Sequence, residues 1–305
     1  MGEKSKKKQS FYEESGSAGT VTHRVLKMTL SIVTLVIVVA IFLFPVYLAL
    51  ISSFKTENEI MGSTMSFPTS FYLDNYVEGL RRSNFTKSML NSVIVVFPSV
   101  ALIVLCSSMG GYTIARNSGK SKLIKVMDTV YLASLMIPFT ILMIPVYKLY
   151  KSMNLINNLF GYGIMLVGTS IAYASFLYTG FVKSVPKELE EAASIDGAGP
   201  YYTFFRIVFP LLMPVTATVT ALHVMWLWND FNISIILLQK EAVRTLTVKQ
   251  YYFFGEHTAD YGPAFAASIL CMVPVLLVFV PFPPERTEKS EEKRNESQAF
   301  LAART

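Results

Sequence analysis

The sequence is poor in charged residues and in the side chains that form metal sites or act as nucleophiles. Asp, Glu, Lys and Arg make up only 16% of its 305 residues, whereas a soluble domain has about a quarter. It contains three histidines and two cysteines, and Cys106 and Cys271 lie in apolar runs without His or Cys at metal-ligand spacing. The sequence therefore supports neither a disulfide framework nor a zinc site, and it implies no metal and no cofactor.

Hydrophobic residues, at 52%, dominate instead and indicate an integral membrane protein. The hydrocarbon core of a bilayer is about 30 Å thick and needs roughly 20 apolar residues of helix. Runs of that kind predict an all-α, polytopic protein with six transmembrane helices, at 28–53, 89–115, 124–147, 158–182, 210–238 and 264–282. Prolines interrupt several of these runs. Pro138 and Pro145 in MIPFTILMIPVY are candidate hinges, and simple curvature of the bundle is the alternative.

The charge of the connecting segments predicts how the chain lies in the membrane. Residues 1–27 are polar and basic, and no small-residue cleavage site follows the first apolar run, so we expect this segment to stay in the cytoplasm. Lys and Arg are twice as frequent in the predicted inner segments as in the outer ones, which places both termini in the cytoplasm. These basic residues are spread over loops without an aromatic-interleaved face, so nucleic acid is not an expected partner. Residues 283–305 are polar and expected to be disordered.

The predicted inner segment 186–210 reads PKELEEAASIDGAGPYYTFFRIVFP. Its proline and acidic residues suit a helix N-terminus and Gly197 suits a left-handed stop, which predicts a short helix over 186–196. A second helical run, YYTFFRIVF, follows it. Helical spacing separates an apolar side from a charged side, namely Leu189, Ala192 and Ala193 from Lys187, Glu190, Glu191 and Ser194. Another protein's backbone could approach the small residues, and Glu191 could pair with a cation on that partner.

The spacing of this segment carries a family signature. Permease subunits of binding-protein-dependent ABC importers share EAA, three residues, G, nine residues and I-x-L-P. The chain resembles them through Glu191-Ala192-Ala193, Gly197, Ile207 and Pro210, with Phe209 where Leu is usual. VPKELEEAASIDGA is similar to the carbohydrate-uptake branch, and in particular to the second permease subunit of maltose and multiple-sugar systems. NSVIV, GGYTIAR and WLWNDF extend the resemblance over about 28–280.

The resemblance implies a type I permease domain over 28–282, which pairs with a homologous second permease to form a heterodimer. Two separate ATP-binding subunits would dock at the EAA loops and hydrolyse ATP, so this chain would not itself be an enzyme. An extracellular binding protein would deliver a sugar, expected to be an oligosaccharide, to the outer face of the bacterial plasma membrane. The coupling loop would consist of Glu191, Ala192, Ala193, Asp196, Gly197, Ala198, Ile207 and Pro210.

Two further patterns concern the translocation pathway and rival functions. Trp226, Trp228, Asn229 and Asp230 combine aromatic, amide and acid groups, so they either line a sugar pathway or form an aromatic belt at the membrane surface. SGKS at 118–121 lacks the first glycine of a phosphate-binding loop, so the chain is not expected to bind ATP. The alternatives are a permease for a non-sugar solute, and a secondary transporter working without an ATPase. A membrane-embedded enzyme would need a constellation of acids and histidines, and the chain offers only isolated ones.

Overall fold

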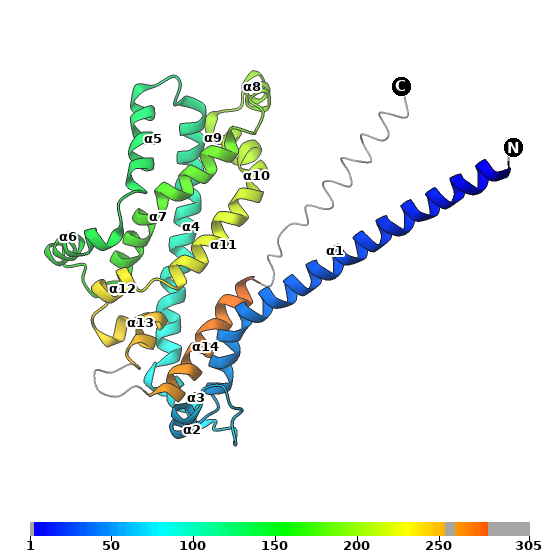
Figure 1. Ribbon diagram of the computed structural model, residues 1–305. Helices are drawn as coiled ribbons and strands as arrows, with labels where there is room; N and C mark the ends of the chain where they lie inside the picture. The colour runs from blue at the N-terminus through cyan, green and yellow to red at the C-terminus, as the bar shows by residue number, and fades with distance from the viewer. Residues whose placement is uncertain (1–2, 254–259, 280–305) are drawn as a thin grey trace.

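The computed structural model describes residues 3–253 and 260–279, which are largely helical and contain no strand. The polar tail expected at 283–305 lies outside the described residues. The longest helix, α1 (Glu3–Ser52), projects away from the other helices over most of its length (Figure 1). The most apolar 18-residue window within Leu26–Ser52 has no buried residue, and only the end of the helix, at Ile51 and Ser52, is buried. This helix therefore presents its apolar surface to lipid or to another subunit.

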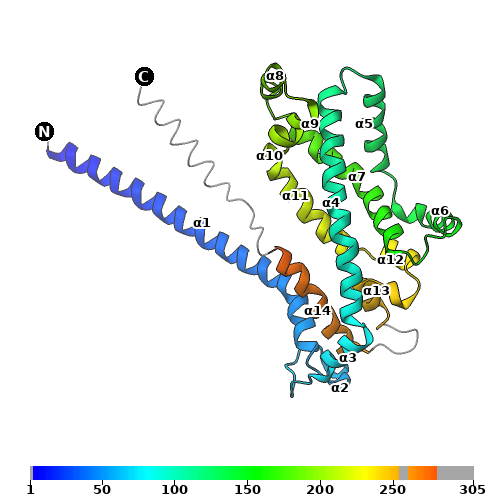
Figure 2. The same cartoon turned by 180° about the vertical axis from the view of Figure 1, so that it is seen from behind.

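The core of the bundle is the pair α4 (Phe85–Asn117) and α7 (Leu159–Val182). Figure 2 shows α4 running along the length of the bundle. Small residues bring the two backbones together, because a Cβ placed on Gly111 would lie only 2.6 Å from the Cβ of Tyr178. Hydroxyl groups also bond across the contact, from Ser107 Oγ to the Ile171 carbonyl at 3.2 Å and from Thr179 Oγ1 to the Gly111 carbonyl at 3.3 Å.

The remaining helices are shorter and cluster at the two ends of this pair. At one end lie α2 (Glu57–Gly62), α3 (Asp74–Arg82), α12 (Asn232–Leu237), η2 (Glu241–Val243), α13 (Leu246–Tyr251) and the start of α14 (Tyr261–Phe279). At the other end lie α5 (Lys122–Ser134), α8 (Glu188–Ile195), α9 (Pro200–Thr203), the π-turn η1 (Phe204–Val208) and α10 (Phe209–Leu211). From α10 the chain enters α11 (Met213–Trp228), and α6 (Phe139–Ser152) lies across the side of the bundle.

The observed helices confirm an all-α fold and correct two of the six expected spans. Three described helices are long and apolar enough to cross a membrane, and up to five spans result if each sharply bent pair counts as one. The expected span 124–147 is broken, because α5 and α6 meet at 106°. The expected span 210–238 ends as a long helix at Trp228 and continues as the short α12. The described part of the sixth span is the shorter apolar helix Tyr261–Leu277, so the total of six stays a prediction.

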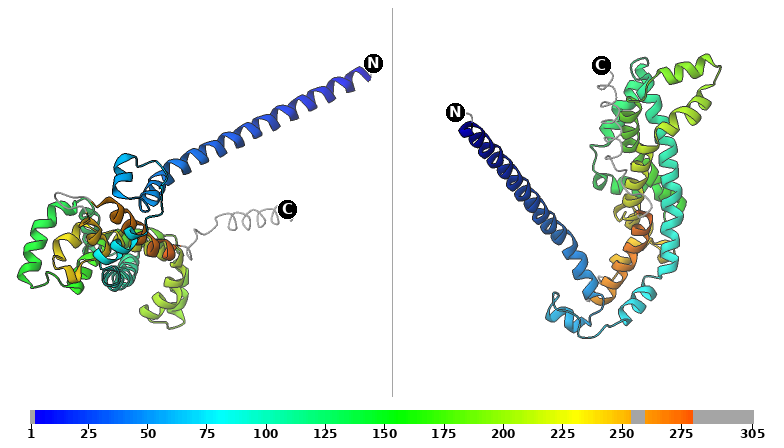
Figure 3. Two further views of the ribbon diagram at one scale, coloured as in Figure 1. Left: turned by 90° about the horizontal axis from the view of Figure 1, so that it is seen from below. Right: turned by 90° about the vertical axis from the view of Figure 1, so that its right-hand side faces the viewer.

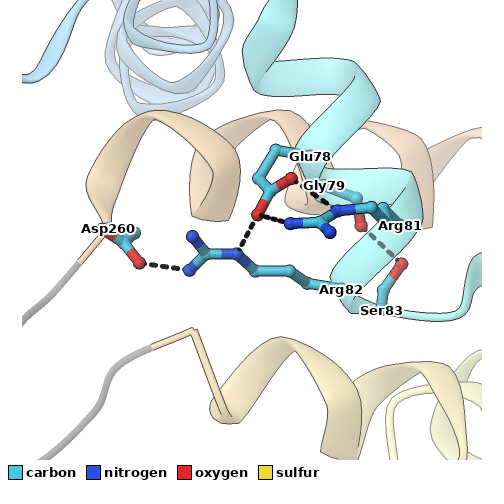
Figure 4. Close-up of polar contacts among 6 residues, drawn as sticks. All are labelled: Glu78, Gly79, Arg81, Arg82, Ser83 and Asp260. Carbon is cyan, nitrogen blue, oxygen red and sulfur yellow. Dashed lines mark hydrogen bonds and ion pairs between the residues drawn. The ribbon is translucent and has the colours of Figure 1, made fainter.

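Polar contacts fix α3 to the residue before α14 and to the segment that follows α1. Glu78 forms ion pairs with Arg81 and Arg82, and Arg82 also pairs with Asp260 just before α14 (Figure 4). Asn75, on α3, donates hydrogen bonds to the Ser53 and Lys55 carbonyls at 3.0 and 2.8 Å. These contacts hold the end of α1, α3 and the start of α14 together.

Candidate functional site

The segment 186–210 folds into a hook at one end of the bundle, formed by α8, α9, η1 and α10. Figure 3 shows it projecting sideways beyond the end of α4. The observed α8 begins at Glu188 instead of Pro186, and Lys187 is the residue that precedes its first turn. Gly197 has a φ of 82°, a left-handed conformation that glycine adopts without strain, so the predicted helix stop is confirmed.

The second half of the hook is anchored in the core. Its helical turns run without interruption from Pro200 to Leu211, and the chain then bends by 76° into α11. Phe204, Val208 and Leu212 point into the main hydrophobic cluster and are 3%, 0% and 0% exposed. The hook therefore has a buried base, which holds its outer turn at a fixed place relative to α11.

The outer turn of the hook is exposed and hollowed. Among the coupling-loop residues, Glu191, Ala192, Asp196, Gly197 and Pro210 are exposed, Ala198 and Ile207 are half-buried and Ala193 is buried. A groove of about 720 Å³ is lined by Ala193, Asp196, Gly197, Ala198, Gly199, Tyr202, Arg206 and Ile207. The loop thus brings most of its predicted residues to one surface.

Large apolar side chains that the sequence analysis did not include in the site lie beside this groove. Ile195, the last residue of α8, is 86% exposed, and Tyr201 is 71% exposed. With Tyr202, which lines the groove and is 60% exposed, these side chains gather at the outer turn and make it a candidate contact for a partner. The sequence held a signal for it, since Ile195 is an apolar residue directly before the acid and glycine that end the helix.

Glu190 does not lie on the outward charged side, and the prediction that grouped it with Glu191 is wrong. Its carboxylate turns inward, where Oε1 accepts from Arg116 Nε at 2.8 Å and lies 2.6 Å from Arg116 Nη2. Its other oxygen, Oε2, accepts from the Tyr112 hydroxyl at 2.7 Å. Arg116 Nη2 also donates to the Val185 carbonyl, at 2.9 Å. Counting helical faces on α8 alone missed this arrangement, because the attracting cation belongs to α4.

The four residues expected along a pathway do not form one surface. Trp228 packs in the core, whereas Trp226 is 44% exposed and stacks near Tyr173 with ring centres 5.1 Å apart. The exposed Asn229 donates to the Met225 carbonyl at 2.8 Å. Asp230 accepts hydrogen bonds from the Tyr162 hydroxyl and the Ser234 amide, both at 3.0 Å, at the start of α12. Asp230 and Trp228 thus have structural partners, and Trp226 and Asn229 are the two that face outward.

The two proline candidates occupy different positions in the bent third span. Pro138 directly precedes α6, at the 106° break between α5 and α6, while Pro145 lies inside α6. Pro138 is therefore at the bend itself. In the described residues no group of three or more His, Cys, Asp or Glu side chains is placed to hold a metal ion.

A helical bundle with long apolar spans and a projecting hook that carries the EAA spacing is the architecture of a transport permease. Residues 103–281 match the family described as binding-protein-dependent transport system inner membrane component. The chain belongs to this family and is an inner-membrane permease component of an ABC import system, which confirms the resemblance carried by the EAA loop.

Curated relatives cover most of the chain. It is 34% identical over 242 residues to the multiple sugar-binding transport system permease protein MsmG of Streptococcus mutans, which covers 79% of this chain and 87% of the relative. It is also 34% identical, over 258 residues, to the melibiose/raffinose/stachyose import permease protein MelC of Bacillus subtilis, with 83% and 91% covered.

Solved structures show the same fold at lower identity. A bacterial ABC transporter for import of the acidic polysaccharide alginate matches with a TM-score of 0.71 and 20% identity, over 84% of this chain and 94% of that one. A chain from such a transporter, in complex with a periplasmic protein bound to an alginate pentasaccharide, matches with a TM-score of 0.57 and 18% identity, over 79% and 91%.

Proposed function

We propose that the chain is the permease subunit of an ATP-driven sugar importer, with an oligosaccharide as cargo. It forms half of the translocation pathway together with a homologous second permease, and its hook docks on a separate ATPase subunit. The observation that carries this proposal is the hook itself: a rigid, hollowed surface that holds the EAA motif outside the bundle. The curated relatives, named for multiple sugars and for melibiose, raffinose and stachyose, support a sugar as cargo.

The chemistry of the hook suits a protein partner. Small residues at Ala192, Gly197 and Gly199 let a partner's backbone approach closely. Covering the exposed Ile195 would stabilise the contact by about 1.5–3 kcal/mol. Glu191 extends into solvent beside it and offers its carboxylate to a cation on the partner. The groove would accept a projecting side chain of the ATPase.

The proposed orientation places the hook in the cytoplasm. Four basic residues lie at the same end of α4 and α5, namely Arg116, Lys120, Lys122 and Lys125, as the positive-inside rule favours for a cytoplasmic end. The start of α1 also extends toward this end (Figure 1). The opposite end, with α2 and α3, would face the extracellular sugar-binding protein. Residues 28–282 would form the permease domain, with 1–27 and 283–305 as cytoplasmic extensions.

The pathway and its movement follow from the same assignment. Trp226 and Asn229 expose an aromatic ring and an amide on one side of α11, so they are the residues of the WLWNDF segment that would contact sugar. ATP binding would close the ATPase dimer, draw the hooks together and rock the attached helices as rigid bodies. Pro138, at the break between α5 and α6, would serve as a hinge in that motion.

Co-purification tests the docking step. The ATPase should remain with the wild-type importer in detergent and be lost from Glu191→Lys, because the variant reverses the charge offered to it. Glu57→Lys is the matched control, since it makes the same change at an exposed acid on the opposite end of the bundle. A wild-type chain that accumulates sugar in vesicles without any ATPase would instead indicate a secondary transporter and contradict the proposal.

A further inference from the structure

The contact between the hook and α4 is a largely buried ion pair. The side chains of Arg116 and Glu190 are 10% and 16% exposed, whereas each of the other described ion pairs has a partner at least 35% exposed. An arginine paired with a carboxylate away from water is held in a narrow range of geometries, because the planar guanidinium and the carboxylate match only in certain orientations. This pair lies where α8 meets the end of α4.

Further hydrogen bonds restrict the rotation of α8 against α4. Tyr112, one turn before Arg116 on α4, donates to the second oxygen of Glu190, so both carboxylate oxygens are held from α4. Arg116 also bonds the Val185 carbonyl, in the turn that precedes α8. The bond at the Val185 carbonyl holds the turn before α8, and the bonds at the Glu190 carboxylate hold α8 itself. A rotation of α8 against α4 would therefore break charge-assisted bonds.

On the bundle side, the ion pair belongs to α4, which is a long and closely packed helix. α4 is 33 residues long, which corresponds to about 50 Å at about 1.5 Å per residue. It packs along α7 at a distance that leaves no room for a Cβ at Gly111, one residue before Tyr112. Any displacement of α8 that keeps the ion pair intact is consequently passed to α4 and α7 together.

We propose that Arg116 and Glu190, with Tyr112, are positioning residues that fix the hook to α4, so that movement of the ATPase is passed to the pathway helices. This inference rests on the proposed function, since it assumes that an ATPase moves the hook. It gives two adjacent acids different partners. Glu191 faces the ATPase subunit, and Glu190 pairs with Arg116 of the helix bundle. Neither Arg116 nor Glu190 would touch nucleotide or transported solute.

The test measures whether α8 and α4 move as one body. Spin labels are attached to cysteines at Lys187, the residue directly before α8, and at the exposed Leu102 of α4, after replacement of Cys106 and Cys271. Leu102 lies 14 residues before Arg116, about 21 Å along the helix. The distance distribution is recorded for the whole importer in nanodiscs, without nucleotide and with ATP plus vanadate.

In the wild type we expect one narrow distance that ATP plus vanadate leaves unchanged. In Arg116→Met and in Glu190→Gln, nucleotide should broaden that distance or shift it by about 1–2 Å or more, the usual scale of helix shifts in switching proteins. Arg116→Lys, which keeps the charge but loses the fork of donors, should give an intermediate change. Glu190→Gln preserves the side-chain shape and carries the test should Arg116→Met fail to assemble.

Controls separate this inference from the function on which it depends. Glu78→Gln removes a Glu–Arg pair at the opposite end of the bundle and should leave the distance as in the wild type. A wild-type chain that retains no ATPase would refute the proposed function. An importer that retains its ATPase, yet shows the same narrow and nucleotide-independent distance in both Arg116→Met and Glu190→Gln, would overturn only the inference. A nucleotide-dependent distance in the wild type would overturn it as well.

Discussion

Because α4 and α7 lie so close together at Gly111, we expect Gly111→Ala to lower the free energy of unfolding. The added methyl group would lie 2.6 Å from the Cβ of Tyr178, 2.9 Å from the Ser175 carbonyl oxygen and 3.0 Å from the Thr179 amide nitrogen. Two of these three atoms are backbone, so no side-chain rotation relieves the overlap. Ordinary contact begins at 3.4 Å, so the helices must separate by roughly 0.8 Å near Tyr178.

Overpacking of this kind costs about 1–3 kcal/mol, and the better helix propensity of alanine returns at most about 1 kcal/mol. Gly111→Ala should therefore lower the free energy of unfolding by up to about 2 kcal/mol, and Gly110→Ala, which gains the propensity without the overlap, should be about 1–3 kcal/mol more stable than it. Gly110→Ala is the control, because its methyl would meet only Ser175 Oγ, at an ordinary 3.6 Å. Titration with SDS followed by circular dichroism measures both. Equal stability of the two variants would refute the packing argument.

Two further predictions concern the end of the bundle with α2 and α3. The pKa of Glu59 is lowered to about 2, foremost by a hydrogen bond from the Thr69 side chain, so Thr69→Val should raise this pKa toward the usual 4.5 in a carbon-13 NMR titration. Because the pKa is lowered, ionised Glu59 stabilises the fold above about pH 4.5, and this stabilisation is lost as pH falls toward 2. A Glu59 pKa that is unchanged in Thr69→Val would exclude the Thr69 hydrogen bond as the cause. Gly262→Ala should destabilise the fold by about 1–3 kcal/mol, since its methyl would lie 2.6–2.8 Å from the Asn75 amide group, whereas Gly62→Ala meets open space. Equal unfolding midpoints in SDS would count against the second prediction.

Hydropathy predicted where apolar helices occur but not where they bend. The run 124–147 has the composition of one span, yet α5 and α6 meet at 106° with Pro138 at the junction. A proline inside an apolar run is compatible with a mild kink, a hinge or a sharp break, and packing against neighbouring helices decides among these. Sequence alone could not supply that packing.

In the candidate site, too, the sequence predicted the local features but not those that depend on residues far apart in the chain. Local patterns sufficed for the short helix α8 and for its stop at Gly197, which the positive φ confirms. The role of Glu190 could not be read locally, because its partner Arg116 lies 74 positions away in the sequence. Adjacent glutamates look equivalent on a helical wheel, and only the burial of a cation from α4 beside one of them separates their directions.

Photo-cross-linking at Ile195 tests the central claim, that the hook is the surface on which an ATPase docks. A cross-linking amino acid at this 86% exposed position should form an adduct with a nucleotide-hydrolysing protein in the native membrane, identified by mass spectrometry. The same residue at Phe71, 75% exposed near the opposite end, should not capture that protein. Adducts at Ile195 with lipid alone, and with no ATP-hydrolysing protein, would contradict the account.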